Sequence, residues 1–226
     1  MIPKHFHRIW VGPPPPSDML AMMCDPAWSL LHPGWGSTLW TDGFEWHGEH
    51  DVHARPIEDL QNQDLFDRAE EIVGPNEVGQ FRADVARLEI LHRHGGVYVD
   101  CDMEARKSFA PLLVAECFAG FEDPECRWVN NAVFGAEAGH PFLAALIEAL
   151  PASVAAAQRA GIRRPNRFSG PQFITPIWSS RFRESVTVHP SSCFYPYSWS
   201  ALDRKGEDFP DAYAVHHWAH RRATRG

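Results

Sequence analysis

The chain has 226 residues, 44% of them hydrophobic, and a formal net charge of −8. This length predicts one domain over residues 1–226, large enough for a sheet covered by helices. The negative charge excludes a general nucleic-acid-binding protein, because such proteins need a basic surface. We expect no signal peptide and no membrane-spanning stretch, so any membrane association would be peripheral. The five cysteines are widely spaced without a CxxC pair, which predicts free thiols in a reducing, cytoplasmic compartment.

The first third of the chain alternates strand and helix signals. Ser17 is the predicted N-cap of the first helix, which Pro26 should break or kink. The polar stretch 43–56, with His47, His50 and His53, favours an exposed loop over a metal site. In chain order, we expect a strand over 6–11, a helix over 17–31, a strand over 38–41 and a partly helical stretch over 56–73.

A long helix and a short strand follow in the middle of the chain. Phe81, Val85, Leu88 and Leu91 recur at helical spacing and predict one buried face. Gly95-Gly96 should end the helix, because glycine adopts the left-handed conformation without strain. The apolar residues 97–99 then predict a buried strand.

The remaining elements continue the alternation. We expect strands over 117–121 and 128–134, helices over 140–150 and 171–182, and strands over 186–189 and 213–217 that close the sheet. Strands alternating with helices predict an α/β protein with a mostly parallel sheet flanked by helices.

Two carboxylates, Asp100 and Asp102, come directly after the predicted central strand. Continued strand geometry would place them on one face, with Cys101 on the other. Carboxylates this close repel each other unless a cation lies between them. Ligands of open α/β sheets bind at the carboxyl ends of strands. We therefore predict a Mn²⁺ or Mg²⁺ site, since both ions prefer oxygen ligands and leave positions open for substrate phosphates.

The central block resembles the DXD block of glycosyltransferase family 32. It comprises Arg82, Asp84 and Arg87, followed by Leu91 and the run 95–102. This family includes yeast initiating mannosyltransferases and bacterial capsular-polysaccharide transferases, and clostridial toxin glucosyltransferase domains share the block. Further segments that resemble the family in order are 2–12, 28, 32–35, 39–42, 131–132, 140–142, 169–171 and 214–218. The resemblance implies a GT-A type, Rossmann-like fold.

The resemblance also implies roles for individual residues. Trp10 would stack on the base, and Tyr98 would lie in the core or beside the base. Asp84 and Arg87 would hold ribose or sugar hydroxyls and the diphosphate. The remaining assignments are Asp102 as the main metal ligand, Asp100 on metal or ribose, His216 rather than His217 as third ligand, Asn131 near the donor sugar or leaving oxygen, and Trp218 over the donor.

The expected activity is metal-dependent, retaining transfer of a hexose from a UDP- or GDP-sugar to an acceptor hydroxyl. The catalytic set would be Asp102, Asn131 and Arg87, with added positive field from Arg221 or Arg222. The acceptor is open among glycans, lipid-linked groups, proteins and small molecules. One departure concerns the residues after Trp218, where the family's small residue, Ser and Trp are replaced, so the closing loop should differ.

Two other functions stay open from the sequence. A metal-dependent phosphatase also places Asp-x-Asp at a strand end, although here the continuation is Met103-Glu104 after a charged helix. A non-catalytic nucleotide-sugar-binding module is the second alternative, because the altered C-terminus is compatible with a degenerate enzyme.

Overall fold

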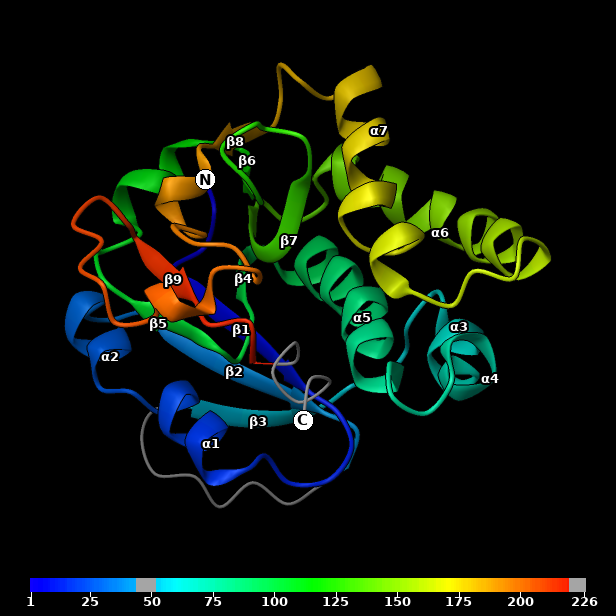
Figure 1. Cartoon of the computed structure of the whole chain (residues 1–226), viewed down its shortest axis with the longest axis horizontal. Coiled ribbons are helices and arrows are strands. Elements are labelled where there is room, and N and C mark those ends of the chain that lie inside the picture. The colour runs from blue at the N-terminus through cyan, green and yellow to red at the C-terminus, as the bar shows by residue number, and fades with distance from the viewer. Residues whose placement is uncertain (44–51, 220–226) are drawn as a thin grey trace.

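A seven-stranded sheet forms the centre of the protein (Figure 1), in a computed structural model that describes residues 1–43 and 52–219. The strand order is β3-β2-β1-β4-β7-β6-β8, and β5 and β9 form a separate two-stranded sheet. The strands are β1 (His5–Trp10), β2 (Gly36–Thr41), β3 (Val52–Pro56), β4 (Gly96–Val99), β5 (Met103–Ala105), β6 (Cys117–Phe121), β7 (Val129–Ala136), β8 (Thr187–His189) and β9 (Ala214–His216).

Helices cover both faces of the main sheet (Figure 1). The apolar faces of α5, α6 and α7 pack on one side, and α2 packs on the other side together with the small β5–β9 sheet. The helices are α1 (Ser17–Met23), α2 (Ala27–Leu31), α3 (Gln63–Asp67), α4 (Ala69–Val73), α5 (Val78–His94), α6 (Pro141–Arg159) and α7 (Pro171–Arg181).

The pairing pattern brings several strand ends to one edge of the sheet. The strands β3, β2, β1 and β4 run parallel, whereas β7 is antiparallel to both β4 and β6. The carboxyl ends of β1, β4 and β6 therefore meet at the same edge, where open α/β sheets bind ligands. The predicted mostly parallel α/β architecture is confirmed.

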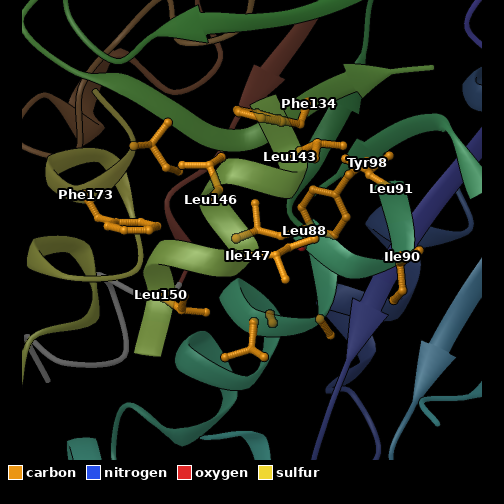
Figure 2. Packing of buried hydrophobic residues seen from close by; sticks show 14 of the residues in the cluster. Leu88, Ile90, Leu91, Tyr98, Phe134, Leu143, Leu146, Ile147, Leu150 and Phe173 are labelled. Atoms are coloured by element: carbon orange, nitrogen blue, oxygen red, sulfur yellow. The ribbon is translucent and has the colours of Figure 1, made fainter. Parts of the chain in front are cut away.

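The main core lies between α5, α6 and the sheet (Figure 2). The predicted apolar face of α5 is buried, with Leu88 and Leu91 both below 2% exposure. Figure 2 shows these side chains facing Leu143 and Ile147 of α6, with Tyr98 of β4 beside them. The rigid packing of α5 on β4 fixes the point at which the chain leaves β4.

Two glycines join α5 to β4 in a crowded turn. Gly95 and Gly96 have φ angles of +64° and +102°, and a Cβ on Gly96 would lie 2.8 Å from the carbonyl oxygen of His5. Burial lowers the pKa of His7 to about 3, so its ring is neutral. Nδ1 of His7 accepts from Trp40 Nε1 (3.1 Å), and Nε2 therefore donates to the Gly95 carbonyl (2.9 Å). This bond ties the turn to β1.

Four predictions about elements were wrong in part. Residues 52–56 of the predicted loop form β3, because they extend the parallel ladder beside β2; residues 44–51, with His47 and His50, lie outside the described residues. Pro16, not Ser17, is the N-cap residue of α1. The segment 214–216 pairs with β5 and does not close the main sheet.

The fourth correction concerns α6, which continues beyond the predicted end at Leu150 to Arg159. Pro151 lies inside the helix and lacks the N–H that would bond to residue 147. Buried Val154 and Ala157 keep the following turns on the core, so packing overrides the proline.

Candidate functional site

The acidic pair lies in a turn directly after β4. The Asp100 N–H donates to the Ala132 carbonyl (2.8 Å), and the Met103 N–H donates to the Asp100 carbonyl (3.2 Å). The strand thus ends at Val99, and the expectation that strand alternation aligns the two carboxylates was wrong. The turn nevertheless brings both to one point. Nε2 of His216 lies 3.0 Å from Asp102 Oδ1 and 3.7 Å from Asp100 Oδ2.

In each carboxylate, one oxygen is held by the protein and the other faces His216. Oδ1 of Asp100 accepts from the Tyr98 hydroxyl (2.6 Å) and lies 3.2 Å from Nη1 of Arg87. Oδ2 of Asp102 accepts from the Ala219 N–H (2.7 Å). The other oxygen of each residue faces His216, so orientation and ligation use different atoms.

The cluster has the chemistry of a cation site. Ligand atoms of Asp100, Asp102 and His216 all lie within 4.8 Å of one another. Two carboxylates and one imidazole suit a hard or borderline divalent ion. Nδ1 of His216 is buried and has no hydrogen-bond partner among residues 1–43 and 52–219, whereas metal-ligating histidines usually have one. The residues therefore fit a divalent cation, with this one outer contact missing.

The electrostatics of the cluster depend on the same pair. Burial alone would raise the pKa of Asp102, but His216 lowers it to about 2. Burial likewise disfavours protonated His216, yet the Asp102 carboxylate raises the pKa of His216 above its ordinary value. His216 and Asp102 therefore stabilise each other's charged forms at the point where the cation would bind.

A second buried cluster, centred on Asp84 and Arg87, contacts the first through Arg87 and Asp100. Asp84 accepts hydrogen bonds from Asn131 Nδ2 (2.8 Å) and Ser169 Oγ (2.7 Å), and it lies 3.2 Å from Nη2 of Arg87. Arg87 also donates through Nε to the Ala83 carbonyl (3.1 Å) and through Nη1 to the Asn131 carbonyl (2.7 Å). Burial raises the pKa of Asp84, and Arg87 and the hydrogen bonds oppose that rise.

These contacts place Asp84 and Arg87 as positioning groups. Both are below 5% exposed, and protein partners occupy much of their hydrogen-bonding capacity. Arg87 spans from Asp84 to Asp100 and so links α5 to the acidic turn. Direct contact of either residue with a donor substrate stays a prediction.

A cavity of about 710 Å³ opens over both clusters. Every site residue predicted from the sequence lies at its wall: Trp10, Asp84, Arg87, Tyr98, Asp100, Asp102, Asn131, His216 and Trp218. The volume is in the range of small-molecule sites. The structure therefore brings the whole predicted set together around one space.

The aromatic residues contribute differently to this wall. Trp10 is half-buried, and its indole N–H donates to the Pro13 carbonyl (2.7 Å). Tyr98 is 1% exposed, and its hydroxyl donates to Asp100, so it offers little surface to a molecule in the cavity. The Trp218 ring packs 4.2 Å from the His216 ring, with its backbone at φ +54°. A non-glycine residue in that conformation is strained, and such strain is common at functional sites.

Several cavity residues were missed by the sequence reasoning. They are Glu122, Asn130, Asn166, Trp199 and Lys205. Glu122 follows the carboxyl end of β6 as Asp100 follows that of β4, which was a usable signal. Asn130 lies where the register of β7 on β6 shifts, and it donates to Glu122 (3.2 Å). Asparagine is depleted in strands, so the two consecutive asparagines of this strand could have indicated the irregularity. Arg221 and Arg222 lie outside the described residues.

Comparisons with known proteins agree with this geometry. Residues 22–119 match the family described as "glycosyltransferase sugar-binding region containing DXD motif". The chain is 24% identical over 242 residues to inositol phosphoceramide mannosyltransferase 3 of Schizosaccharomyces pombe, covering 96% of this chain and 60% of that protein. It is 29% identical over 120 residues to mannosyl phosphorylinositol ceramide synthase SUR1 of Saccharomyces cerevisiae, covering 53% of this chain and 28% of that protein. The chain thus spans less than two thirds of either relative's length.

Solved structures share the fold at low sequence identity. PaToxG glycosyltransferase superposes with a TM-score of 0.62 at 18% identity, over 80% of this chain and 70% of that one. Galactosyltransferase LgtC, in complex with donor and acceptor sugar analogs, gives 0.56 at 12% identity, over 98% of this chain and 94% of that one. The UDP-bound glycosyltransferase domain from the YGT toxin gives 0.55 at 10% identity, over 83% and 79%.

Proposed function

We propose that this chain, of which residues 22–119 match the family of glycosyltransferase sugar-binding regions containing a DXD motif, transfers a hexose from a nucleotide-sugar to an acceptor hydroxyl with retention at the anomeric carbon. The observation that carries the proposal is the arrangement of Asp100, Asp102 and His216. Each carboxylate turns one oxygen toward His216 while the protein holds the other, at the wall of a cavity on the ligand-binding edge of the sheet. We propose Mn²⁺, with Mg²⁺ as the alternative, as the ion held there.

The cavity wall supports an arrangement for the donor. Trp10 follows the carboxyl end of β1 and offers an aromatic surface for the base. Asp100, Asp102 and His216 would lie next to the diphosphate, and Asn131 would lie next to the sugar. Asp84 would hold Asn131 in place, and Arg87 would hold Asp100 in place.

The chemistry follows from leaving-group departure. When bound, a divalent cation supplies positive charge that stabilises the departing nucleoside diphosphate. The bond between the anomeric carbon and the diphosphate oxygen breaks, and its electron pair leaves with the diphosphate. The acceptor oxygen bonds to the oxocarbenium-like carbon from the same face, and its proton passes to the departing diphosphate oxygen. The tethered carboxylates keep their positions during this step because Tyr98, Arg87 and the Ala219 N–H hold them.

The acceptor is proposed from the relatives. The names of both yeast proteins refer to a ceramide that carries an inositol phosphate, which is a lipid-linked polyol. We propose a lipid-linked hydroxyl as the first acceptor class to test here, and a mannosyl nucleotide as the first donor, beside UDP-hexoses.

The direct test is a panel of UDP- and GDP-hexoses with Mn²⁺, with release of nucleoside diphosphate as the readout. We expect turnover with one donor and its loss on chelation of the metal. Asp102→Asn should lower turnover by at least about a hundredfold, because a ligand and a fixed charge are lost together. Asp208→Asn makes the same chemical change at an exposed position and should have no effect.

The same assay separates the alternatives. Full activity of Asp102→Asn would refute the assignment of Asp102. Donor binding without turnover across all acceptors would indicate a binding module, and release of inorganic phosphate from phosphomonoesters would indicate a phosphatase.

A further inference from the structure

Positive charge is unevenly distributed along this acidic chain. Residues 149–183 contain six arginines and no aspartate, glutamate or lysine, although the whole chain has a net charge of −8. Four of the six lie within nine residues at the end of α6 and in the segment leading to α7. We call these four, Arg159, Arg163, Arg164 and Arg167, the basic connection. A local excess of one sign in a chain of the other sign favours contact with an anionic partner.

The four arginines are available for such a contact. All are exposed, whereas Pro165 between them is buried and holds the segment on the protein. Within residues 1–43 and 52–219, none of the four lies within 4 Å of a carboxylate oxygen. Exposed Arg68 and half-buried Arg204, by contrast, each pair with a glutamate on their own segment. The charge of the basic connection is therefore not neutralised locally.

The helix before the basic connection has an apolar outer side. In length and composition α6 would be able to cross a membrane, but its buried residues, 39% of that stretch, pack in the core with α5 and α7. It is therefore a core helix with its remaining surface facing outward. The exposed or half-buried residues there are mainly small and apolar: Ala144, Ala145, Ala149, Ala152, Ala155 and Ala156, with Glu148 the acidic exception.

The basic connection also adjoins the cavity. Asn166, between Arg164 and Arg167, lines the cavity, as does Pro171 at the start of α7. Ser169 in the same segment bonds to Asp84 (2.7 Å). Figure 1 shows the end of α6 at the periphery of the molecule and the following segment returning from there to the start of α7, near α5. A flat partner docked on the arginines would therefore lie beside the cavity.

We infer that the basic connection and the outer side of α6 dock the protein on the surface of an anionic phospholipid bilayer. Arginines beside a shallow apolar surface match the headgroup layer, where charge attraction and partial burial act together. Such docking would present a lipid-linked acceptor to the cavity, and this consequence rests on the proposed function. The docking itself does not require that function.

The test is co-sedimentation of the full chain with vesicles. One set contains phosphatidylcholine alone, and the other contains about 30% phosphatidylserine in phosphatidylcholine. We expect binding to the anionic vesicles, little binding to the neutral ones, and a loss of binding when salt is raised from about 0.1 M to about 0.5 M. The double variant Arg163→Glu/Arg164→Glu should bind at least about tenfold more weakly, because each arginine near the surface contributes attraction.

A matched control carries the same change in charge elsewhere. Arg181→Glu/Arg183→Glu alters two exposed arginines at the opposite end of α7 and should retain nearly all binding. Arg163→Gln/Arg164→Gln replaces the first variant if that variant fails to fold, as judged by thermal melting. Equal loss in the variant and the control would overturn the inference, as would equal binding to neutral vesicles or equal binding to single-stranded RNA.

A second readout separates this inference from the proposed function. Thermal shift by Mn²⁺ with UDP or GDP should be the same in the wild type and in both double variants. Absence of that shift in every protein would count against the proposed function, whereas selective vesicle binding would still support the docking surface.

Discussion

The Tyr98 hydroxyl shows how much of the site depends on side chains that do not ligate. It donates to the oxygen of Asp100 that faces away from His216, and the ring lies against the Arg87 guanidinium, 4.5 Å from its centroid. Burial raises the pKa of Tyr98 well above its ordinary value, so the hydroxyl keeps its proton and remains a donor. The sequence left this residue between core and base, whereas the structure gives it a positioning role.

Tyr98→Phe is therefore expected to weaken Mn²⁺ binding by roughly tenfold to a hundredfold, the usual effect of losing an outer contact. Isothermal titration calorimetry with Mn²⁺ and UDP measures the dissociation constant. Tyr213→Phe makes the same change at a half-buried tyrosine away from the cluster and should leave affinity unchanged. An unaltered affinity in Tyr98→Phe would show that Arg87 alone orients Asp100.

The raised pKa of His216 predicts a pH dependence for metal binding. Below the raised pKa of His216, a cation must displace the proton between His216 and Asp102, since ligation requires the neutral ring nitrogen. Affinity should therefore rise with pH by up to about tenfold per unit below the raised pKa, and level off above it. Calorimetry in two buffers of different ionisation enthalpy should detect proton release. His216→Gln should bind more weakly and lose this dependence, and a flat profile in the wild type would contradict the ion pair.

At the scale of elements, the sequence predicted what local pattern controls. The 3.6-residue spacing in α5, the Gly95-Gly96 stop and the buried strand after it all appear as expected. Pairing between distant segments was not predictable from local pattern. The strands β5 and β9 pair although they are more than a hundred residues apart in sequence. For the site, the residue types identified the ligands, but the turn at Asp100 and the bonds through Arg87 and Ala219 depend on tertiary packing.

The crowding of the α5–β4 turn can be measured with two glycines that have nearly the same φ angle. Gly96 and Gly206 have φ angles of +102° and +101°, but a Cβ on Gly96 would lie 2.8 Å from backbone, whereas a Cβ on Gly206 would have no atom within 4 Å. Gly206→Ala should cost about 1–2 kcal/mol of unfolding free energy from conformation alone. Gly96→Ala should cost a further 1–3 kcal/mol or so from overpacking. Urea denaturation measures both losses of unfolding free energy. Equal losses would show that the backbone of β1 at His5 can move away from the added methyl group at no cost.

For the whole molecule, the Asp84 cluster joins parts of the chain that the sequence separates widely. It connects α5 to Asn131 in β7 and to Ser169 before α7, and Arg87 extends it to the acidic turn. The cavity is built between these parts, so its shape depends on this buried junction. The sequence pattern indicated Asp84 and Arg87 as important, but their burial could not be read from it.

Asp84→Asn should lower the free energy of unfolding by about 3 kcal/mol, because it leaves the buried Arg87 without one of its counter-charges. The control Asp64→Asn removes a carboxylate that is 72% exposed and paired with Arg68, and should change stability by less than about 0.5 kcal/mol. Chemical denaturation followed by tryptophan fluorescence compares the two. Similar small losses in both would mean that Asp100 compensates fully within the junction.

The tethering of Asp100 and Asp102 has a consequence for ion selectivity. With Tyr98 and the Ala219 N–H each retaining one oxygen, neither aspartate is free to chelate through both oxygens. Calcium, which gathers many oxygens at longer range, loses the bidentate contacts it favours, whereas compact octahedral ions accept single contacts and fill their remaining positions with water or phosphate. Discrimination between abundant cellular cations would then originate in two hydrogen bonds that never touch the ion.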